Sequence, residues 1–208
     1  MHVRISSERS SRANQVERRA RSRSALLESG ARGLSRYGYG NLRLEEVARE
    51  AGYTRGALYH QFQDKEDLAL AVIAWVDENW AREVGDPAGE ADDPVEELLA
   101  LARGHAVFCR RDIARVVMAL RIEFAGQDHP VGLEIDRIKE MLVKRIASLV
   151  NAGRKNGSIA PGPPARTVAL AVIGALEGAV IMLAGKAPHD EELAARAVAG
   201  VTGLRNPS

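Results

Sequence analysis

Residues 44–68 read LEEVAREAGYTRGALYHQFQDKEDL, and this stretch decides the fold of the N-terminal part of the chain. Up to Ala51 its apolar residues recur at helical spacing, with acids in the first turn, where the helix dipole favours them. Gly52 predicts a sharp turn, because a residue with a Cβ is strained in the left-handed backbone that ends many helices. Thr54 and Asp64 are residue types that cap helices, so one further helix is predicted after each of them.

Two short helices joined by a glycine-containing turn form the helix-turn-helix unit, whose second helix lies in the major groove of DNA. The second predicted helix suits that task, because Arg55 can bind a phosphate or a guanine. Tyr59 and His60 carry hydrogen-bond donors on its outer side, although such a pair can also be a plain surface feature. Gly56 and Ala57 keep the leading face low, so that the backbone can approach the bases.

The stretch from about Arg18 to Trp75 resembles the DNA-binding domain of the tetracycline-repressor (TetR/AcrR) family, most specifically in Gly52–Phe62 and in the DKEDL run that begins at Asp64. It is particularly similar to regulators of multidrug efflux pumps. The resemblance implies an all-α fold, with a basic arm and helix-turn-helix domain over residues 1–64 and a helical effector-binding and dimerisation domain over 65–208. It further implies a homodimer that binds a pseudo-palindromic operator in double-stranded DNA, most simply a repressor released by a small-molecule ligand.

The resemblance also implies which residues contact DNA. Many family members carry Thr or Ser at the start of the first helix of the pair, where this chain has Leu42 and Arg43, so the phosphate contact there would be made by a charge. The implied set is Arg43, Thr54, Arg55, Gly56, Ala57, Tyr59, His60 and Lys65. Two alternatives remain open: an activator or nucleoid-type binder that responds to no ligand, and a helical adaptor that binds proteins.

Composition agrees with an all-helical regulator. The chain is 46% hydrophobic and 27% charged, with only 4% aromatic residues and no sustained β-branched alternation. Residues 1–68 hold 13 basic and 9 acidic side chains, whereas the remainder holds 16 and 19. Seven arginines and two acids fall within the first 23 residues, and residues 1–12 are expected to form a flexible basic arm. That arm is either solvated or in contact with DNA, and the sequence leaves both interpretations open.

The remaining composition argues against several other classes of protein. A single cysteine, Cys109, excludes an intramolecular disulfide framework, and with no secretory signal in view we expect a cytoplasmic protein. The apolar stretch Val168–Gly185 is long enough for a membrane span, but Glu177 at its centre would cost about 2.5–3.5 kcal/mol there, which favours a buried bundle helix and no membrane partner. No phosphate loop, nucleophile elbow or metal-ligand set is present, so neither an enzyme nor a cofactor is expected.

The helices predicted over residues 94–160 are the expected place for an effector. His105 and Cys109 share a helix face, yet no further ligand completes a metal site, so they are expected to be a polar core group and a small buried hydrophobe. For Glu177 a ligand counter-charge, a dimer hydrogen bond and a surface position remain open. The predicted ligand-binding residues are His105, Phe108, Cys109, Met118, Arg121, Phe124 and Glu177. The predicted dimer interface uses small residues on the last two helices: Ala169, Gly174, Ala175, Gly178, Ala179, Leu193, Ala197 and Val201.

Overall fold

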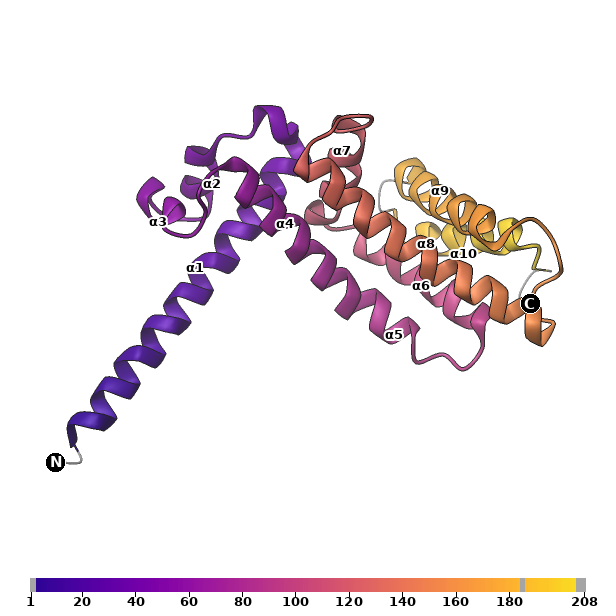
Figure 1. The fold of residues 1–208 in the computed structure, drawn as a ribbon, viewed down its shortest axis with the longest axis horizontal. Helices are drawn as coiled ribbons and strands as arrows, with labels where there is room; N and C mark the ends of the chain where they lie inside the picture. The colour runs from indigo at the N-terminus through magenta and orange to yellow at the C-terminus, as the bar shows by residue number, and fades with distance from the viewer. Residues whose placement is uncertain (1–2, 184–185, 205–208) are drawn as a thin grey trace.

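The computed structural model describes residues 3–183 and 186–204, with side chains described from residue 15 onward, and every regular element in that part of the chain is a helix (Figure 1). The first four are α1 (Val3–Asn41), α2 (Leu44–Glu50), α3 (Arg55–Tyr59) and α4 (Lys65–Trp80). The elements that follow are the π-helical turn η1 (Ala81–Gly85), α5 (Asp86–Ala88), α6 (Pro94–Phe108), the 3-10 turn η2 (Asp112–Arg115), α7 (Val116–Glu123), α8 (Pro130–Asn156), α9 (Ala165–Leu183) and α10 (His189–Thr202).

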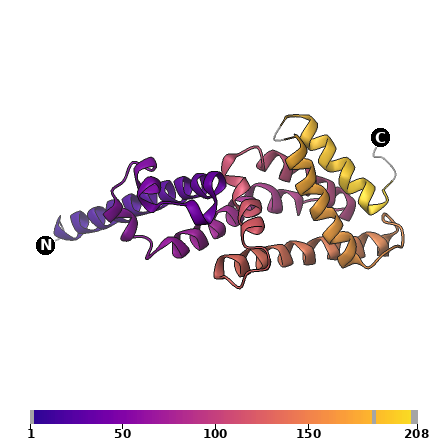
Figure 2. The same ribbon diagram turned by 90° about the horizontal axis from the view of Figure 1, so that it is seen from above.

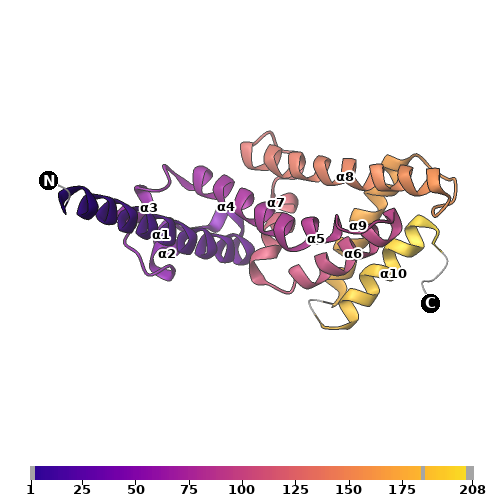
Figure 3. The same ribbon diagram turned by 90° about the horizontal axis from the view of Figure 1, so that it is seen from below.

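The molecule is elongated, with the helix-turn-helix elements at one end and α9 and α10 at the other (Figures 2 and 3). Helix α4 joins the two ends, because its first turns pack on α1 and its last turns pack in the C-terminal domain. A displacement of α4 therefore changes the packing of both domains. The proposed boundary between residues 64 and 65 falls at the start of this shared helix.

The N-terminal domain is held by a small apolar core in which α1 and α4 approach closely. Leu26, Leu58 and Phe62 are almost completely buried. A Cβ on Gly30 of α1 would meet the Val72 side chain at 3.0 Å, so the small residue allows the two helices to touch. This packing fixes the position of α3, which is too short to be stable as an isolated helix.

The predicted turn and caps of the helix-turn-helix are confirmed. Gly52 has a φ of 78°, the left-handed backbone that only glycine adopts without strain. The Thr54 hydroxyl accepts a hydrogen bond from the Ala57 N–H at 3.2 Å, and the Asp64 carboxylate accepts one from Asp67 N–H at 2.9 Å. The sequence signals for starting and stopping these helices are local, which is why they were sufficient here.

The expected flexible arm is wrong as to its backbone, because α1 is already helical at Val3. Residues 3–29 contain neither proline nor glycine, and arginine, glutamate and alanine are good helix formers, so nothing in the sequence stops the helix from extending. Val16 lies beyond the core and its side chain is 69% exposed. The N-terminal part of α1 projects past α2 and α3 (Figure 1).

The C-terminal domain is a bundle in which the apolar helix α9 packs with one face inward. Helix α8 begins at the His129-Pro130 cap, where the imidazole Nδ1 accepts a hydrogen bond from Val131 N–H at 3.2 Å. Helix α9 is long and apolar enough to cross a membrane, and it packs against α6, α8 and α10. Its buried residues, among them Val172 and Leu176, form one core with α6, α8 and α10. This packing is the role that the sequence favoured for the stretch.

Candidate functional site

The helix-turn-helix presents most of its predicted DNA-contacting residues to solvent. Thr54, Arg55, Gly56, Tyr59 and His60 are exposed, whereas Leu58 on the same helix is buried. Helix α3 therefore has one face in the core and one face free, which is the arrangement that a helix needs to enter a major groove.

Two exposed arginines belong to the helix-turn-helix, Arg55 on α3 and Arg43 at the start of α2. The Arg55 guanidinium lies 3.2 Å from the Glu45 carboxylate and 5.3 Å from the centre of the Tyr59 ring. These contacts hold Arg55 beside Tyr59 on the outer surface, and at this exposure the ion pair itself is weak. Arg43 is exposed at the start of α2 and its side chain makes no capping hydrogen bond.

Lys65, one of the predicted DNA-contacting residues, contacts the end of α1. Its ammonium donates a hydrogen bond to the carbonyl of Gly40 at 3.3 Å and lies 4.5 Å from the centre of the Tyr39 ring. The physical reason is that α1 ends directly beside the start of α4, so its free carbonyls attract the nearest cation. Lys65 therefore stabilises the contact between the end of α1 and the start of α4, and its contact with DNA stays a prediction.

The end of α1 also binds a carboxylate from the C-terminal domain. At Gly38 the backbone leaves helical geometry, with φ 72° and ψ 177°, so the next N–H groups lose their helical acceptors. The Glu123 carboxylate, at the end of α7, accepts hydrogen bonds from Tyr39 N–H at 2.6 Å and Gly40 N–H at 2.7 Å. A Cβ on Gly38 would lie 2.7 Å from a Glu123 oxygen, so any other residue would displace this carboxylate, and the positive φ also favours glycine. We call this arrangement the Glu123 clamp.

Aromatic rings surround the clamp, and Phe124 is one of them. Its ring centre lies 5.2 Å from that of Tyr39 and 4.5 Å from the His129 imidazole. Across the same junction, His129 lies 3.7 Å from Glu66 of α4. The expectation that Phe124 contacts an effector is therefore corrected, because the turn after α7 carries its ring to the domain junction and away from the cavity described next.

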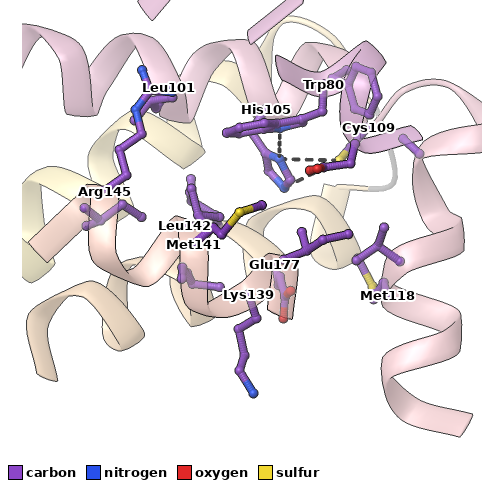
Figure 4. Close-up of a pocket in the computed structure, with 18 of the residues that line it drawn as sticks. Trp80, Leu101, His105, Cys109, Met118, Lys139, Met141, Leu142, Arg145 and Glu177 are labelled. Atoms are coloured by element: carbon purple, nitrogen blue, oxygen red, sulfur yellow. Dashed lines mark hydrogen bonds between the residues drawn. The ribbon is translucent and has the colours of Figure 1, made fainter. Parts of the chain in front are cut away.

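A cavity of about 280 Å³ lies inside the C-terminal domain (Figure 4). Its walls come from α4, η1, α6, α7, α8 and α9 and are mostly aliphatic. Both α4 and α7 also contact α1 of the N-terminal domain. A shift of α4 or α7 at the cavity would therefore move the helices against which α3 is positioned. Its polar and aromatic lining includes Asp77, Trp80, His105, Phe108, Cys109, Met118, Arg121, Lys139, Arg145 and Glu177.

His105 is held as a neutral imidazole in the cavity wall. Its Nδ1 accepts a hydrogen bond from the Trp80 indole N–H at 3.1 Å, and its Nε2 lies 3.5 Å from the Cys109 sulfur (Figure 4). Burial lowers the pKa of His105 to about 4, with a smaller contribution from the charge of Arg121. Burial likewise raises the pKa of the Cys109 thiol to about 12. Among the described residues, no three His, Cys, Asp or Glu side chains come together to hold a metal.

Glu177 forms an ion pair with Arg121. The sequence left open whether Glu177 is a ligand counter-charge, a dimer hydrogen-bonding group or a surface residue, and the ion pair gives it a partner within the same chain. Both side chains line the cavity, one from α9 and one from α7. Burial lowers the pKa of Arg121, and its Nε is a buried donor without a hydrogen-bond partner among the described residues. The Arg121 Nε–H is therefore able to donate a hydrogen bond to a ligand in the cavity. Arg121 lies on α7, the same helix that carries Glu123 of the clamp.

The predicted dimer residues divide into two groups. Gly174 is exposed, with open space where a Cβ would stand, and Gly178 is half-buried with the same open space. Ala175, Ala197 and Val201 are half-buried and Leu193 is 38% exposed. Ala169 and Ala179, in contrast, are buried within the chain, because they face α8 and α10 on the inner side of α9. The outer face carries larger apolar residues that the sequence reading had not selected: Leu170, Ile181 and Met182.

Sequence comparison places the N-terminal domain in a known family. The family model described as "Bacterial regulatory proteins, tetR family" matches residues 26–72. The HTH-type transcriptional repressor BepR of Brucella suis is 29% identical over 167 residues, which cover 74% of this chain and 78% of that protein. The A-factor receptor protein of Streptomyces griseus is 29% identical over 140 residues, 66% of this chain and 46% of that protein.

Solved structures agree on the fold. A TetR transcriptional regulator from Chloroflexus aurantiacus superposes with a TM-score of 0.75 at 19% identity, covering 90% of this chain and 95% of that one. AibR, in complex with isovaleryl coenzyme A and operator DNA, superposes with a TM-score of 0.71 at 23% identity, covering 88% of this chain and all of that one. With its helix-turn-helix, its long α4 and its helical C-terminal domain, the chain carries a tetR-family DNA-binding domain over residues 26–72 and has the fold of the solved TetR-type regulators.

Proposed function

We propose that this protein is a homodimeric repressor that binds a pseudo-palindromic operator and leaves it when a small molecule occupies the cavity in the C-terminal domain. The observation that carries the proposal is that α4 and α7 line the cavity and also hold the N-terminal domain. By analogy, the relative BepR supports the repressor role, and AibR, a structural neighbour solved with isovaleryl coenzyme A and operator DNA, supports the binding of both a small molecule and an operator. No enzymatic role is proposed.

The coupling needed for release is modest. Specific operator binding often exceeds non-specific binding by about 4–10 kcal/mol, so a coupling of about 1–3 kcal/mol is enough to empty an operator. In a dimer, two copies of α3 must lie about 34–36 Å apart to enter successive major grooves. A ligand that moves α4 or α7 changes this spacing, because those helices carry the junction with the N-terminal domain.

The effector has to fit a small and mostly apolar space. A cavity of about 280 Å³ lies near the lower end of the range of small-molecule pockets, about 300–1,000 Å³. Its charged contacts would be made by the Arg121–Glu177 pair or by Asp77, Lys139 and Arg145 elsewhere in the lining, whereas neutral His105 and protonated Cys109 offer weak polarity. A compact molecule with an aliphatic body and one polar group fits this lining.

Selection of bound duplexes from a random pool at about 150 mM salt tests the DNA-reading assignment. We expect the wild type to recover a pseudo-palindromic site and Tyr59→Ala to bind that site about tenfold more weakly, since one base or phosphate contact is lost. Tyr37→Ala is the matched control, because Tyr37 is 49% exposed and lies on α1, while Tyr59 is 42% exposed on α3. Equal binding by the wild type and Tyr59→Ala would contradict the assignment, and enrichment of no sequence would favour a nucleoid-type binder.

Filling the cavity tests the effector assignment. Val117 of α7 lines the cavity and is half-buried, so Val117→Phe reduces the free volume without changing a charge. We expect this variant to bind the selected operator like the wild type and to ignore compounds that release the wild type. The assay is operator release by a panel of small carboxylic acids, alcohols and amines with aliphatic bodies. Release of both proteins by the same compounds at the same concentrations would place the effector site elsewhere.

A further inference from the structure

One side of α1 packs inside the N-terminal domain and continues along the part of the helix that projects beyond it. The residues on this side change from apolar and small to mostly arginine, and we call this side the stripe. Within the domain its members are Leu26, Gly30 and Gly33, which contact α4 and the start of α2. Steps of three and four residues keep to one side of a helix with 3.6 residues per turn. Followed toward the N-terminus at these steps, the stripe holds Arg23, Arg19, Val16, Arg12 and Arg9.

The DNA-reading helix meets α1 on this same stripe. The Gln61 side-chain amide, just after α3, donates hydrogen bonds to the Arg19 carbonyl at 3.4 Å and to the Ser22 hydroxyl at 3.0 Å. The Arg23 guanidinium donates to the Gln61 carbonyl at 3.4 Å and lies 4.7 Å from the centre of the Phe62 ring. The projecting part of α1 therefore leaves the domain beside the C-terminal end of α3 (Figure 1).

No protein covers the projecting part of the stripe among the described residues. Val16 is 69% exposed, and neither Arg19 nor Arg23 forms an ion pair with a described side chain. On the opposite side of the helix the Arg21 guanidinium lies 3.7 Å from the Glu17 carboxylate, so part of the positive charge on that side is balanced by an acid. This row of four arginines, with one acid, Glu8, on the same side, ends at the DNA-reading helix and matches the charge of a nucleic acid backbone.

We propose that this arginine stripe, residues 9, 12, 19 and 23, lies along the phosphate backbone of the DNA that flanks the bases read by α3. The proposal rests on the operator binding proposed above and extends the interface beyond the helix-turn-helix. Contacts of this kind raise affinity and fix orientation without reading sequence. Each phosphate neutralised changes the slope of log K against log salt concentration by about 0.9 on double-stranded DNA.

Two double variants with the same change in net charge test the proposal on the full-length protein. Arg12→Gln with Arg19→Gln removes two charges from the stripe, and Arg18→Gln with Arg21→Gln removes two from the opposite side of the same helix. Glutamine has nearly the helix propensity of arginine, so both variants keep α1 helical, which circular dichroism checks. The binding constant for the selected operator is measured between about 50 and 200 mM salt.

We expect the stripe variant to lower the salt slope by about 3.6, because the dimer loses four phosphate contacts, and to leave the recovered sequence unchanged. The opposite-side variant should change the slope by less than half as much. An equal change in both variants would mean that net charge alone acts, and no change in the stripe variant would mean that the extension does not touch DNA. Either result overturns the proposal. Failure of operator binding itself is distinguishable, since the wild type and Tyr59→Ala would then recover no common site.

Discussion

In the Glu123→Ala variant the backbone amides of Tyr39 and Gly40 are expected to exchange with solvent up to about a hundredfold faster than in the wild type. Both N–H groups donate to the Glu123 carboxylate, at 2.6 and 2.7 Å. A hydrogen bond to a charged group contributes about 1.5–3 kcal/mol. Because the site is partly open to solvent, we expect about 2–3 kcal/mol for the two together. Hydrogen exchange followed by mass spectrometry at residues 38–41 measures the effect directly.

The Glu123 clamp is also expected to matter for DNA binding. It joins α7, which carries Arg121 in the cavity wall, to the end of α1, which packs on α4. Without it the N-terminal domain is held less firmly, so Glu123→Ala should bind the selected operator about tenfold more weakly. It should also respond less to any compound that releases the wild type, because the connection from the cavity is weakened.

Two control variants separate the clamp from a general effect of charge. Glu123→Gln keeps the shape but offers one carbonyl oxygen for two N–H groups, so an intermediate exchange rate is expected. Asp128→Ala removes the same charge from an exposed position in the loop after α7. If Asp128→Ala accelerates exchange at residues 38–41 as much as Glu123→Ala does, the clamp is not the cause.

The sequence predicted the local features of the N-terminal domain because their determinants lie within a few residues of each other. Gly52, Thr54 and Asp64 each fix a turn or a cap through their own backbone or side chain. Leu58 and Phe62 are buried because helical spacing places them opposite the exposed face of α3. Such short-range rules work without knowledge of the tertiary structure.

The domain junction could not be predicted in the same way. Glu123 and its donors are separated by more than 80 residues, and no local pattern indicates that the carboxylate meets the break at Gly38. The same limit explains Phe124, which suits a ligand contact by residue type but lies at the junction because of the packing of α1 against α7. Ala169 and Ala179 were assigned to the dimer face because small residues suit both sides of α9, and only the bundle shows which side is inward.

Stability against unfolding is expected to fall by about 3 kcal/mol between pH 6.5 and pH 4 because of His105. Its pKa is lowered by burial from 6.5 to about 4 in the folded protein. Between these values the unfolded chain binds a proton that the folded chain does not, so acidification favours unfolding. About 2.5 pKa units at 1.36 kcal/mol each give the stated loss. Asp190, whose pKa is lowered from 3.8 by Arg110, loses its contribution only on further acidification.

His105→Asn isolates this effect, because the Asn carbonyl oxygen can replace Nδ1 as acceptor for the Trp80 N–H and does not titrate. Urea unfolding at pH 7 and pH 4.5 should show a smaller loss of stability in the variant than in the wild type, and the double difference removes the other groups that titrate in this range. Protonation would turn Nδ1 into a donor facing the indole N–H, so the same pH change should alter Trp80 fluorescence in the wild type alone. If both proteins lose equal stability, His105 is protonated in the folded state and the cavity wall is wetter than its burial indicates.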